Sequence, residues 1–303
     1  MVMLAASLKP GALAVGDGGE RIIDVHQHVH YLKRDNASLL AHQEAMGISK
    51  TVLLPAGRMV DRASTHAGKS NGLAALVRGN AAAMRLVEAH PDKFVTFANE
   101  VPDVDGAVAE IEAYLKRGAI GIGELKYNLD VDAKPMREIF ALASDYEVPV
   151  LIHFQEGKYN HGLDRFHKVL EAYPKVNFIG HAQTWWANVD KEHKHDPKNY
   201  YPKGKVTAGG ISDRLLGDYE NMFGDLSAGS GQSALTRDME HALGFVERHQ
   251  GKLLFGSDCP DSSGAGKKCT GARTLELIKQ LAPGIDAWRK IVRGNAERIM
   301  KLG

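Results

Sequence analysis

The run Ile22-Ile23-Asp24-Val25-His26-Gln27-His28-Val29 carries two histidines two positions apart among β-branched residues. This composition predicts a β-strand. Because successive side chains of a strand point to opposite faces, we expect Asp24, His26 and His28 to share one face. Two neutral imidazoles on one face suit a metal ion, since each offers a nitrogen lone pair at pH 7. The alternative is that two histidines alternate on a strand by chance.

Seven further apolar runs of similar length follow, and helical patterns separate nearly all of them. The expected strands cover residues 22–29, 50–55, 94–98, 119–126, 148–154, 176–181, 221–227 and 252–258. The expected helices cover residues 35–46, 71–90, 105–117, 134–146, 163–173, 236–249, 274–281 and 285–300. This alternation predicts an α/β fold, a (β/α)8 TIM barrel. The competing fold, a doubly wound sheet, ordinarily has a glycine-rich turn after strand one, where this chain has histidines.

Residues 182–217 depart from the alternation. They are aromatic, rich in Lys and His, and longer than an ordinary connection. We therefore expect an insertion after strand six, over the active site.

The chain has 303 residues, with 38 basic and 37 acidic side chains and a formal net charge of +1. This balance favours a small-molecule substrate and predicts neither a nucleic-acid partner nor a membrane-surface partner. No run of about 18 apolar residues predicts a transmembrane helix. We expect one barrel domain over residues 21–303 after a flexible lead at 1–20, and the sequence leaves a homo-oligomer open.

The first residues leave the location of the protein open between the cytoplasm and export. Met1 to Ala14 is apolar, and Ala12-Leu13-Ala14 has the look of a signal-peptidase site, so the lead is either the remnant of an export signal or a disordered tail. The two cysteines, Cys259 and Cys269, follow the same division. Free thiols are expected in a cytosolic chain, whereas an exported chain favours a local disulfide.

Six polar residues fall at or near the carboxyl ends of five expected strands. They are His26, His28, Glu124, His153, His181 and Asp258. In a (β/α)8 barrel these ends meet at one mouth, which carries the chemistry. Each residue alone has an ordinary explanation, such as a hydrogen-bonded core histidine or a loop cap. Together they predict one site.

At these residues the sequence resembles the amidohydrolase superfamily, in its amidohydrolase-related branch of metal-dependent hydrolases and decarboxylases. The resemblance extends from about Ile22 to Leu302, and its motifs are Ile23-Asp24-Val25-His26-Gln27-His28, Gly121-Ile122-Gly123-Glu124, Val150-Leu151-Ile152-His153, Phe178-Ile179-Gly180-His181, Leu254-Phe255-Gly256-Ser257-Asp258 and Gly294-Asn295-Ala296-Glu297-Arg298. It implies the barrel fold, but it does not select one reaction.

The resemblance implies that His26, His28, His153 and Asp258 bind a metal ion, and that His181 either binds it or polarises the substrate. Glu124 lies where a carboxylate bridges two ions in several branches, although it could instead pair with a nearby cation. Its role decides between one ion and two per chain. Nitrogen-rich ligation favours Zn²⁺, while Mn²⁺, Fe²⁺ and Ni²⁺ remain open.

A divalent ion held in this way lowers the pKa of water from about 15.7 to about 7. Asp258 would then accept and return a proton, and His181 would polarise the scissile carbonyl. For substrate contacts, the candidates are Trp185 and Trp186 after strand six and Lys158 and Tyr159 after strand five. The two tryptophans could equally form a packing pair beneath the insertion.

Our first hypothesis is therefore a metal-dependent hydrolase of a lactone, an ester or an amide. The second keeps the metal and the fold but removes CO₂ from an aromatic or unsaturated carboxylic acid without oxidation. A bridging Glu124 favours hydrolysis, because a second ion helps to generate and hold hydroxide. The third hypothesis is a non-catalytic metal-binding protein.

Overall fold

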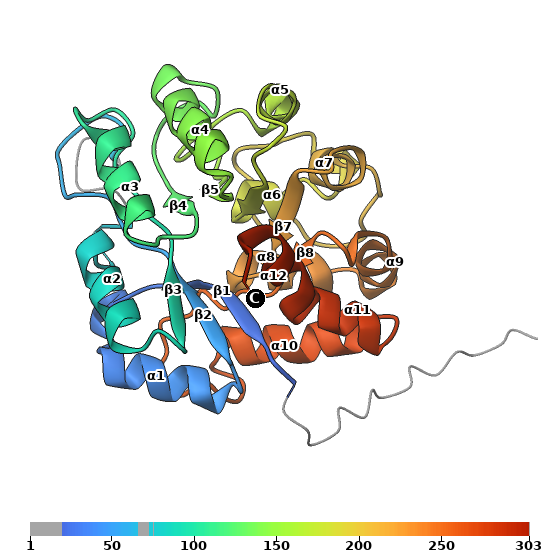
Figure 1. Ribbon diagram of the computed structural model, residues 1–303. Helices are drawn as coiled ribbons and strands as arrows, with labels where there is room; N and C mark the ends of the chain where they lie inside the picture. Colours follow the sequence, from blue (N-terminus) through green and yellow to red (C-terminus); the bar gives the residue numbers. More distant parts are fainter. Residues whose placement is uncertain (1–19, 66–72, 75, 303) are drawn as a thin grey trace, which may run out of the picture.

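The computed structural model describes residues 20–65, 73–74 and 76–302. Within them, eight parallel strands lie at the centre, and helices surround them (Figure 1). The strands are β1 (Ile23–Gln27), β2 (Lys50–Leu53), β3 (Phe94–Thr96), β4 (Ile122–Leu125), β5 (Val150–His153), β6 (Phe178–His181), β7 (Met222–Asp225) and β8 (Leu253–Leu254). The lead expected at residues 1–20 lies, except for Glu20, outside the described residues.

The strands close into a barrel. β1, β2 and β3 pair in order, and β4 to β8 pair in order. The two groups meet where Ala98 forms a parallel bridge with Ile122. At the other seam, Val25 N donates to Phe255 O at 3.1 Å and Asp258 N donates to His26 O at 2.9 Å. This closure confirms the predicted (β/α)8 barrel, because a doubly wound sheet would leave two open edges.

Amphipathic helices form the outer ring. They include α1 (Asn36–Ala45), α2 (Asn80–Ala89), α3 (Ala107–Lys116), α4 (Lys134–Tyr146), α5 (His167–Ala172), α7 (Ile211–Asp218), α9 (Met239–His249), α10 (Thr270–Leu281) and α11 (Ile285–Arg289). In α4, Met136, Ile139, Phe140 and Ala143 are buried. Their spacing of three and four residues places them on the face that packs against the barrel. α1 begins where the Asp35 carboxylate accepts a hydrogen bond from Ser38 N at 2.7 Å.

The last helix, α12 (Asn295–Met300), closes the amino end of the barrel. Ile299 and Met300 join an apolar cluster with interior residues such as Leu151, Ile179 and Phe223. Each of these three precedes a polar residue at the end of its strand by two positions. Figure 1 shows α12 close to the barrel axis. The carboxyl end is therefore the end left for chemistry.

Two helices differ from the expectation. α2 begins at Asn80 rather than at residue 71, because the preceding backbone bonds to the segments that follow β1 and β2. Arg78 N donates to Val29 O, and Arg78 O accepts from Ala56 N. A helix that the sequence did not predict, α8 (Ala228–Thr236), precedes α9. The expected insertion at 182–217 holds α6 (Gln183–Ala187) and most of α7, which is the outer helix between β6 and β7.

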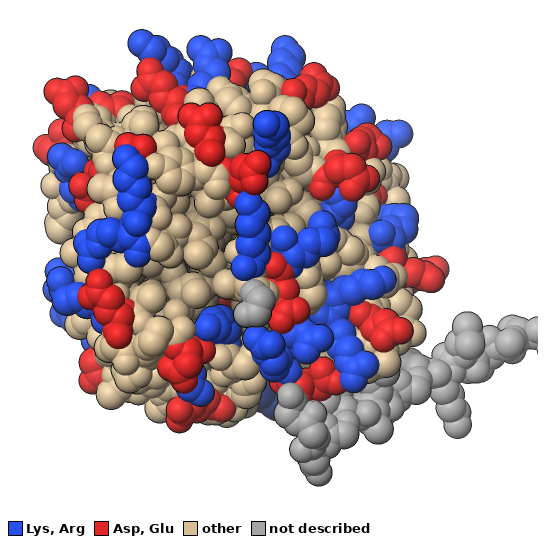
Figure 2. Space-filling model, viewed as in Figure 1, with Lys and Arg blue, Asp and Glu red and all other residues tan. Residues whose placement is uncertain are grey.

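Charged side chains of both signs are interspersed over the face of the molecule shown in Figure 2. This pattern agrees with the near-equal numbers of basic and acidic residues, 38 and 37. Among the helices of the described residues, none combines the length and apolar character needed to cross a bilayer.

Candidate metal centre

The structure brings the six predicted residues of the mouth together. His26, Glu124, His153 and His181 lie in their strands, while His28 follows β1 and Asp258 follows β8. Three groups among them could each hold an ion: His26, His28 and Glu124; His26, His181 and Asp258; and Glu124, His153 and His181. Five of them are buried, and Asp258 is partly buried, with 13% of its side chain exposed. The fold thus converges these groups as the strand positions predict.

Asp24 does not point to this centre with His26 and His28, although strict alternation predicts one shared face for the three. The pairing of β1 with β2 is irregular between Asp24 and Gln27. Ile23 and Val25 consequently point into the barrel interior, and His26 still reaches the mouth. The Asp24 carboxylate instead accepts hydrogen bonds from Ser257 N at 2.9 Å and from Gln43 Nε2 at 3.1 Å.

Hydrogen bonds outside the centre orient the first two imidazoles. His26 Nδ1 lies 2.7 Å from Asp225 Oδ2, and His28 Nδ1 lies 2.7 Å from Leu54 O. Both partners can only accept, so each Nδ1 carries a proton. The two Nε2 atoms, 3.2 Å apart, then turn lone pairs toward each other. Such a pair needs either a metal ion or a proton between or beside the two nitrogens.

The other two imidazoles are held in the same way. His181 Nδ1 lies 3.1 Å from Asp225 Oδ2 and 3.0 Å from Ser227 Oγ. His153 Nε2 lies 3.1 Å from Gln155 Oε1, which directs its Nδ1 to the centre. Asp225 therefore orients two candidate ligands, although the sequence analysis did not predict Asp225 as a site residue. Its place at the end of β7 is the signal that could have identified it.

Glu124 lies between the two sides of the centre. Its Oε2 atom is 3.5 Å from His26 Nε2 and 3.6 Å from His28 Nε2. Its Oε1 atom is 2.5 Å from His153 Nδ1. Burial would raise the pKa of Glu124, but Lys126 and His153 hold it well below its ordinary value. The carboxylate is therefore ionised, with one oxygen toward each side.

Asp258 supplies a further carboxylate. Burial would raise its pKa, but His26 and His28 lower the pKa of Asp258 to about 2. Among the described residues, its buried Oδ1 atom has no hydrogen-bond partner, although this oxygen lies 3.4 Å from His28 Nε2. A buried anionic oxygen without a hydrogen bond is costly unless a cation faces it.

The charges of the centre also fit a divalent ion. Burial lowers the pKa of His26, but Asp258 and Asp225 raise it well above the ordinary value. Without a metal, these carboxylates therefore retain a proton on His26. Four oriented imidazoles and two facing carboxylates form the donor set of a divalent-metal site.

The predicted substrate residues lie in different surroundings. Trp185 and Trp186 are 0% and 1% exposed and belong to the main core. Trp185 stacks on Phe154 at 6.0 Å, and Trp186 Nε1 donates to Asp225 O at 2.9 Å. This is the packing pair that was the alternative interpretation, and Trp186 supports the strand that carries Asp225.

The loop after β5 contributes one predicted residue to the vicinity of the mouth. Tyr159 is buried, with its ring 5.7 Å from the His153 ring, whereas Lys158 is exposed. Lys126 Nζ lies 5.6 Å from the centre of the Tyr159 ring. Lys126 thus brings a cation next to Glu124 and His153.

The family of the chain follows from its sequence. The model of the amidohydrolase family matches residues 23–302, which include every residue of the centre. The chain belongs to the amidohydrolase family. Members of this family are enzymes that typically bind a divalent metal ion, and this amidohydrolase has groups of His, Asp and Glu side chains that could hold one. No curated protein matches the sequence.

Solved structures share the fold at low identity. One is 5-carboxyvanillate decarboxylase from Sphingomonas paucimobilis, with a TM-score of 0.58 and 15% identity over 94% of this chain and 100% of that chain. Another is a probable 2-pyrone-4,6-dicarboxylic acid hydrolase from Acinetobacter baumannii, with a TM-score of 0.57 and 13% identity over 93% and 100%. An uncharacterized TIM-barrel protein from Bordetella bronchiseptica has a TM-score of 0.62 and 18% identity over 93% and 98%. These similarities show the fold of this amidohydrolase and not its reaction.

Proposed function

We propose that this amidohydrolase is a metal-dependent hydrolase of a small lactone, ester or amide, with two divalent ions at the mouth of the barrel. The observation that carries the proposal is the position of Glu124. One of its oxygens faces His26 and His28, and the other faces His153. A carboxylate in this position is suited to bridge two ions, and paired ions favour hydrolysis.

The proposed ligands divide between the two ions. His26, His28, Asp258 and Glu124 would hold the first, and Glu124, His153 and His181 would hold the second. Zn²⁺ is the expected metal, because imidazole nitrogens dominate the set. When bound, such ions supply an activated water at neutral pH and polarise a carbonyl.

Asp258 is the proposed proton carrier. Its pKa of about 2 keeps it ionised at neutral pH, so it can accept a proton from the attacking water. It can then return that proton to the leaving group. His181, oriented by Asp225, would either complete the second site or polarise the substrate carbonyl.

Non-oxidative decarboxylation is the second candidate. Two observations favour it: Lys126 is a cation beside Glu124 and His153 that suits a substrate carboxylate, and a solved structure of the same fold is a decarboxylase by name. A non-catalytic metal-binding role is the third candidate. It predicts bound metal without turnover of any substrate.

A substrate panel tests the reaction. The metal-loaded protein would be incubated with lactones, esters, amides and aromatic carboxylic acids in water labelled with ¹⁸O. Our proposal predicts an acid product that contains ¹⁸O. Release of CO₂ without such incorporation would instead establish decarboxylation, and no turnover on any substrate would support the third candidate.

The Glu124→Gln variant tests the bridge. We expect it to bind one metal ion fewer per chain than the wild type, measured by plasma mass spectrometry. We also expect hydrolysis to fall by at least roughly 100-fold, about 3 kcal/mol of barrier. Glu138→Gln, on the exposed face of α4, is the matched control and should change neither value. An unchanged metal content in Glu124→Gln would exclude a bridging role.

A further inference from the structure

A second group of metal-ligating side chains lies beside the barrel. His42 is on α1, Cys259 and Asp261 follow β8, and Cys269 directly precedes α10. Their donor atoms all lie within 4.8 Å of one another. None of the four belongs to the centre at the mouth. The two cysteines are ten positions apart in the sequence, but His42 meets them only in the fold.

The separations among the two sulfurs and His42, and the separation of His42 from Asp261, fit one tetrahedral ion. The two Sγ atoms are 3.8 Å apart. His42 Nε2 lies 3.2 Å from Cys259 Sγ, 3.6 Å from Cys269 Sγ and 3.3 Å from Asp261 Oδ2. For Zn²⁺ with sulfur at about 2.3 Å and nitrogen at about 2.0 Å, a tetrahedron gives S–S and S–N separations of about 3.8 and 3.5 Å.

Outer hydrogen bonds orient the ligands. Asp261 Oδ1 accepts from Ser263 N and Gly264 N, both at 3.0 Å, and its Oδ2 is left to face His42. Cys269 Sγ accepts from Ala272 N at 3.4 Å. Support of this kind is characteristic of metal ligands.

The surroundings also suit an ion with thiolate ligands. His42, Cys259 and Cys269 are at most 1% exposed. Two thiolates and one carboxylate carry three negative charges, one more than the two positive charges of a divalent ion. Buried Arg34 compensates, since its Nη1 donates to Cys259 O at 3.0 Å and to Asp261 O at 2.7 Å.

Gln43, the neighbour of His42, can hydrogen-bond to His42 both with and without a bound ion. Gln43 Nε2 lies 3.4 Å from His42 Nδ1, which places the histidine proton on Nε2, where it faces the sulfurs. Within the described part of the chain, the buried Gln43 Oε1 has no partner. A rotation of the amide would offer this oxygen to a proton on Nδ1, and Nε2 would be free to bind an ion. The rotation would break the hydrogen bond from Gln43 Nε2 to Asp24 Oδ2, and Ser257 would remain as a donor to the Asp24 carboxylate.

We propose that His42, Cys259, Asp261 and Cys269 form a structural Zn²⁺ site. Side chains fill all four positions, and closed four-coordinate sites of this kind are structural rather than catalytic. The ion would tie the loop after β8 to α1. Because that loop starts at Asp258, the ion would also fix the position of the proposed proton carrier.

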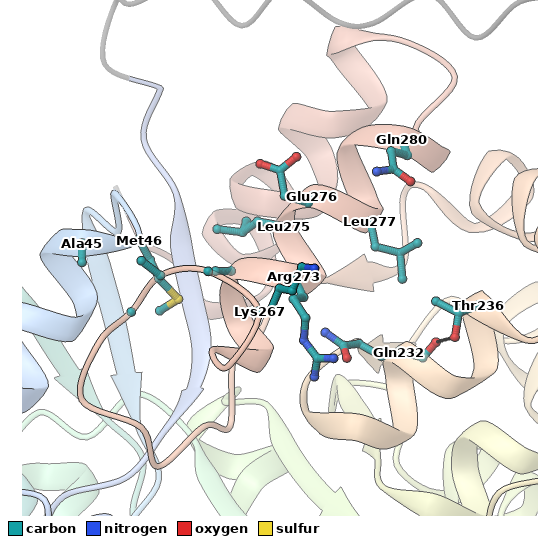
Figure 3. Close-up of a pocket in the computed structure, with 14 residues that line it drawn as sticks. Ala45, Met46, Gln232, Thr236, Lys267, Arg273, Leu275, Glu276, Leu277 and Gln280 are labelled. Atoms are coloured by element: carbon teal, nitrogen blue, oxygen red, sulfur yellow. Dashed lines mark hydrogen bonds between the residues drawn. The ribbon is translucent and has the colours of Figure 1, made fainter.

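A cavity of about 680 Å³ lies near this site. Figure 3 shows the residues that line this cavity. Residues of α1, α8, α10 and the loop after β8 line it. Met46 is one of them, and its Sδ atom lies 3.6 Å from Cys269 Sγ. Met46 thus separates the cavity from Cys269, and none of the four proposed ligands lines the cavity itself.

Cobalt substitution tests the site with a readout that is independent of activity. Cys259 and Cys269 are the only cysteines in the chain, and the mouth offers no sulfur ligand. After exchange of zinc for Co²⁺, we expect a thiolate-to-cobalt charge-transfer band. The band should weaken in Cys269→Ser, disappear in the double variant Cys259→Ala, Cys269→Ala, and persist in His26→Ala. The double variant should contain one zinc ion fewer than the wild type.

Two results would overturn the proposal. The first is a wild-type chain that binds Co²⁺ without a charge-transfer band. The second is alkylation of denatured, chelator-treated protein that modifies neither cysteine until a reductant is added, because this would identify a disulfide. Both measurements use the wild type, so they decide the question even if the variants fail to fold. Neither depends on which reaction the mouth catalyses.

Discussion

Asp225 orients two imidazoles with one carboxylate, and its substitution tests that role. Asp225→Asn removes the charge and leaves one acceptor oxygen for His26, His181 and Ser227. We expect the affinity of the mouth for Zn²⁺ to fall by about 10- to 100-fold, the usual effect of losing an outer-shell partner. Competition with a metal-binding dye measures this change. Asp218→Asn, exposed at the end of α7, should have no effect, and equal affinities in the two variants would contradict the assignment.

Gly256 lies where the mouth has no room for a side chain. A Cβ atom there would be 2.4 Å from Asp225 Oδ1 and 2.9 Å from His26 Cβ. Gly256→Ala should therefore lower the free energy of unfolding by about 1–3 kcal/mol and reduce metal content. Urea unfolding tests this prediction, with Gly229→Ala as control, since nothing lies within 4 Å of its Cβ position. A similar free energy of unfolding for both variants would show that Asp225 and His26 can shift to accommodate the added Cβ atom.

The individual residues of the mouth were predictable because strand ends converge in a barrel. His26, His28, Glu124, His153 and Asp258 required only the strand assignment and the topology. The partners of the imidazoles were less predictable. Leu54 O meets His28 through the pairing of β1 with β2, and Asp225 meets His26 only after the barrel closes. Gln155, by contrast, is a local partner two residues from His153. The prediction that Asp24 shares a face with the histidines was wrong for a local reason. The irregular pairing of β1 with β2 breaks the alternation on which that prediction depended.

At the level of elements, Asp213 joins α7 to α9. It lies 2.6 Å from His249 Nε2 and 3.2 Å from Arg248 Nη2, and it accepts from Gly209 N at 2.7 Å. Burial alone would raise the pKa of Asp213, but these partners hold it well below its ordinary value. The ionised carboxylate therefore stabilises the folded state at neutral pH, and this contribution is lost as the pH falls below about 4.

Asp213→Asn should lower the free energy of unfolding at pH 7 by about 1–3 kcal/mol. The difference from the wild type should shrink as the pH falls below about 4, because the wild-type carboxyl then takes up a proton. Urea unfolding at a series of pH values measures both effects. A difference that stays constant down to acid pH would assign the effect to packing rather than to charge.

The helices that the sequence predicted correctly are those whose apolar residues have a regular helical spacing. α4 has the predicted bounds, because its apolar residues keep helical spacing and Pro135 lies in its first turn. α8 escaped prediction because its sequence, Ala228-Gly-Ser-Gly-Gln-Ser-Ala-Leu-Thr236, is rich in glycine and serine, which lack helical propensity. Its place in the structure comes from packing against α6, α9 and α10, which no local pattern reveals.

For the whole molecule, removal of metal should reduce thermal stability. Glu124 and Asp225 are buried anions and Asp258 is a partly buried one, and without the metal a proton on His26 would compensate only part of their charge. An ion present at 100 times its dissociation constant contributes about 2.7 kcal/mol per site, so dialysis against a chelator should lower the Tm by several degrees. Scanning calorimetry tests this, and Zn²⁺ should restore the Tm whereas Mg²⁺ should not. An unchanged Tm after complete removal would show that the carboxylates are satisfied without an ion.

The seam between β8 and β1 joins the two ends of the proposed ligand set. Asp258 N donates to His26 O there, and 232 residues separate the two in the chain, from position 26 to position 258. During translation the histidine pair is made first and Asp258 long afterwards. The first ion therefore cannot find its full set of ligands on the ribosome until the last strand has emerged. We therefore expect a chain that ends before β8 to lack a ligand of the first ion, although it still carries the three proposed ligands of the second.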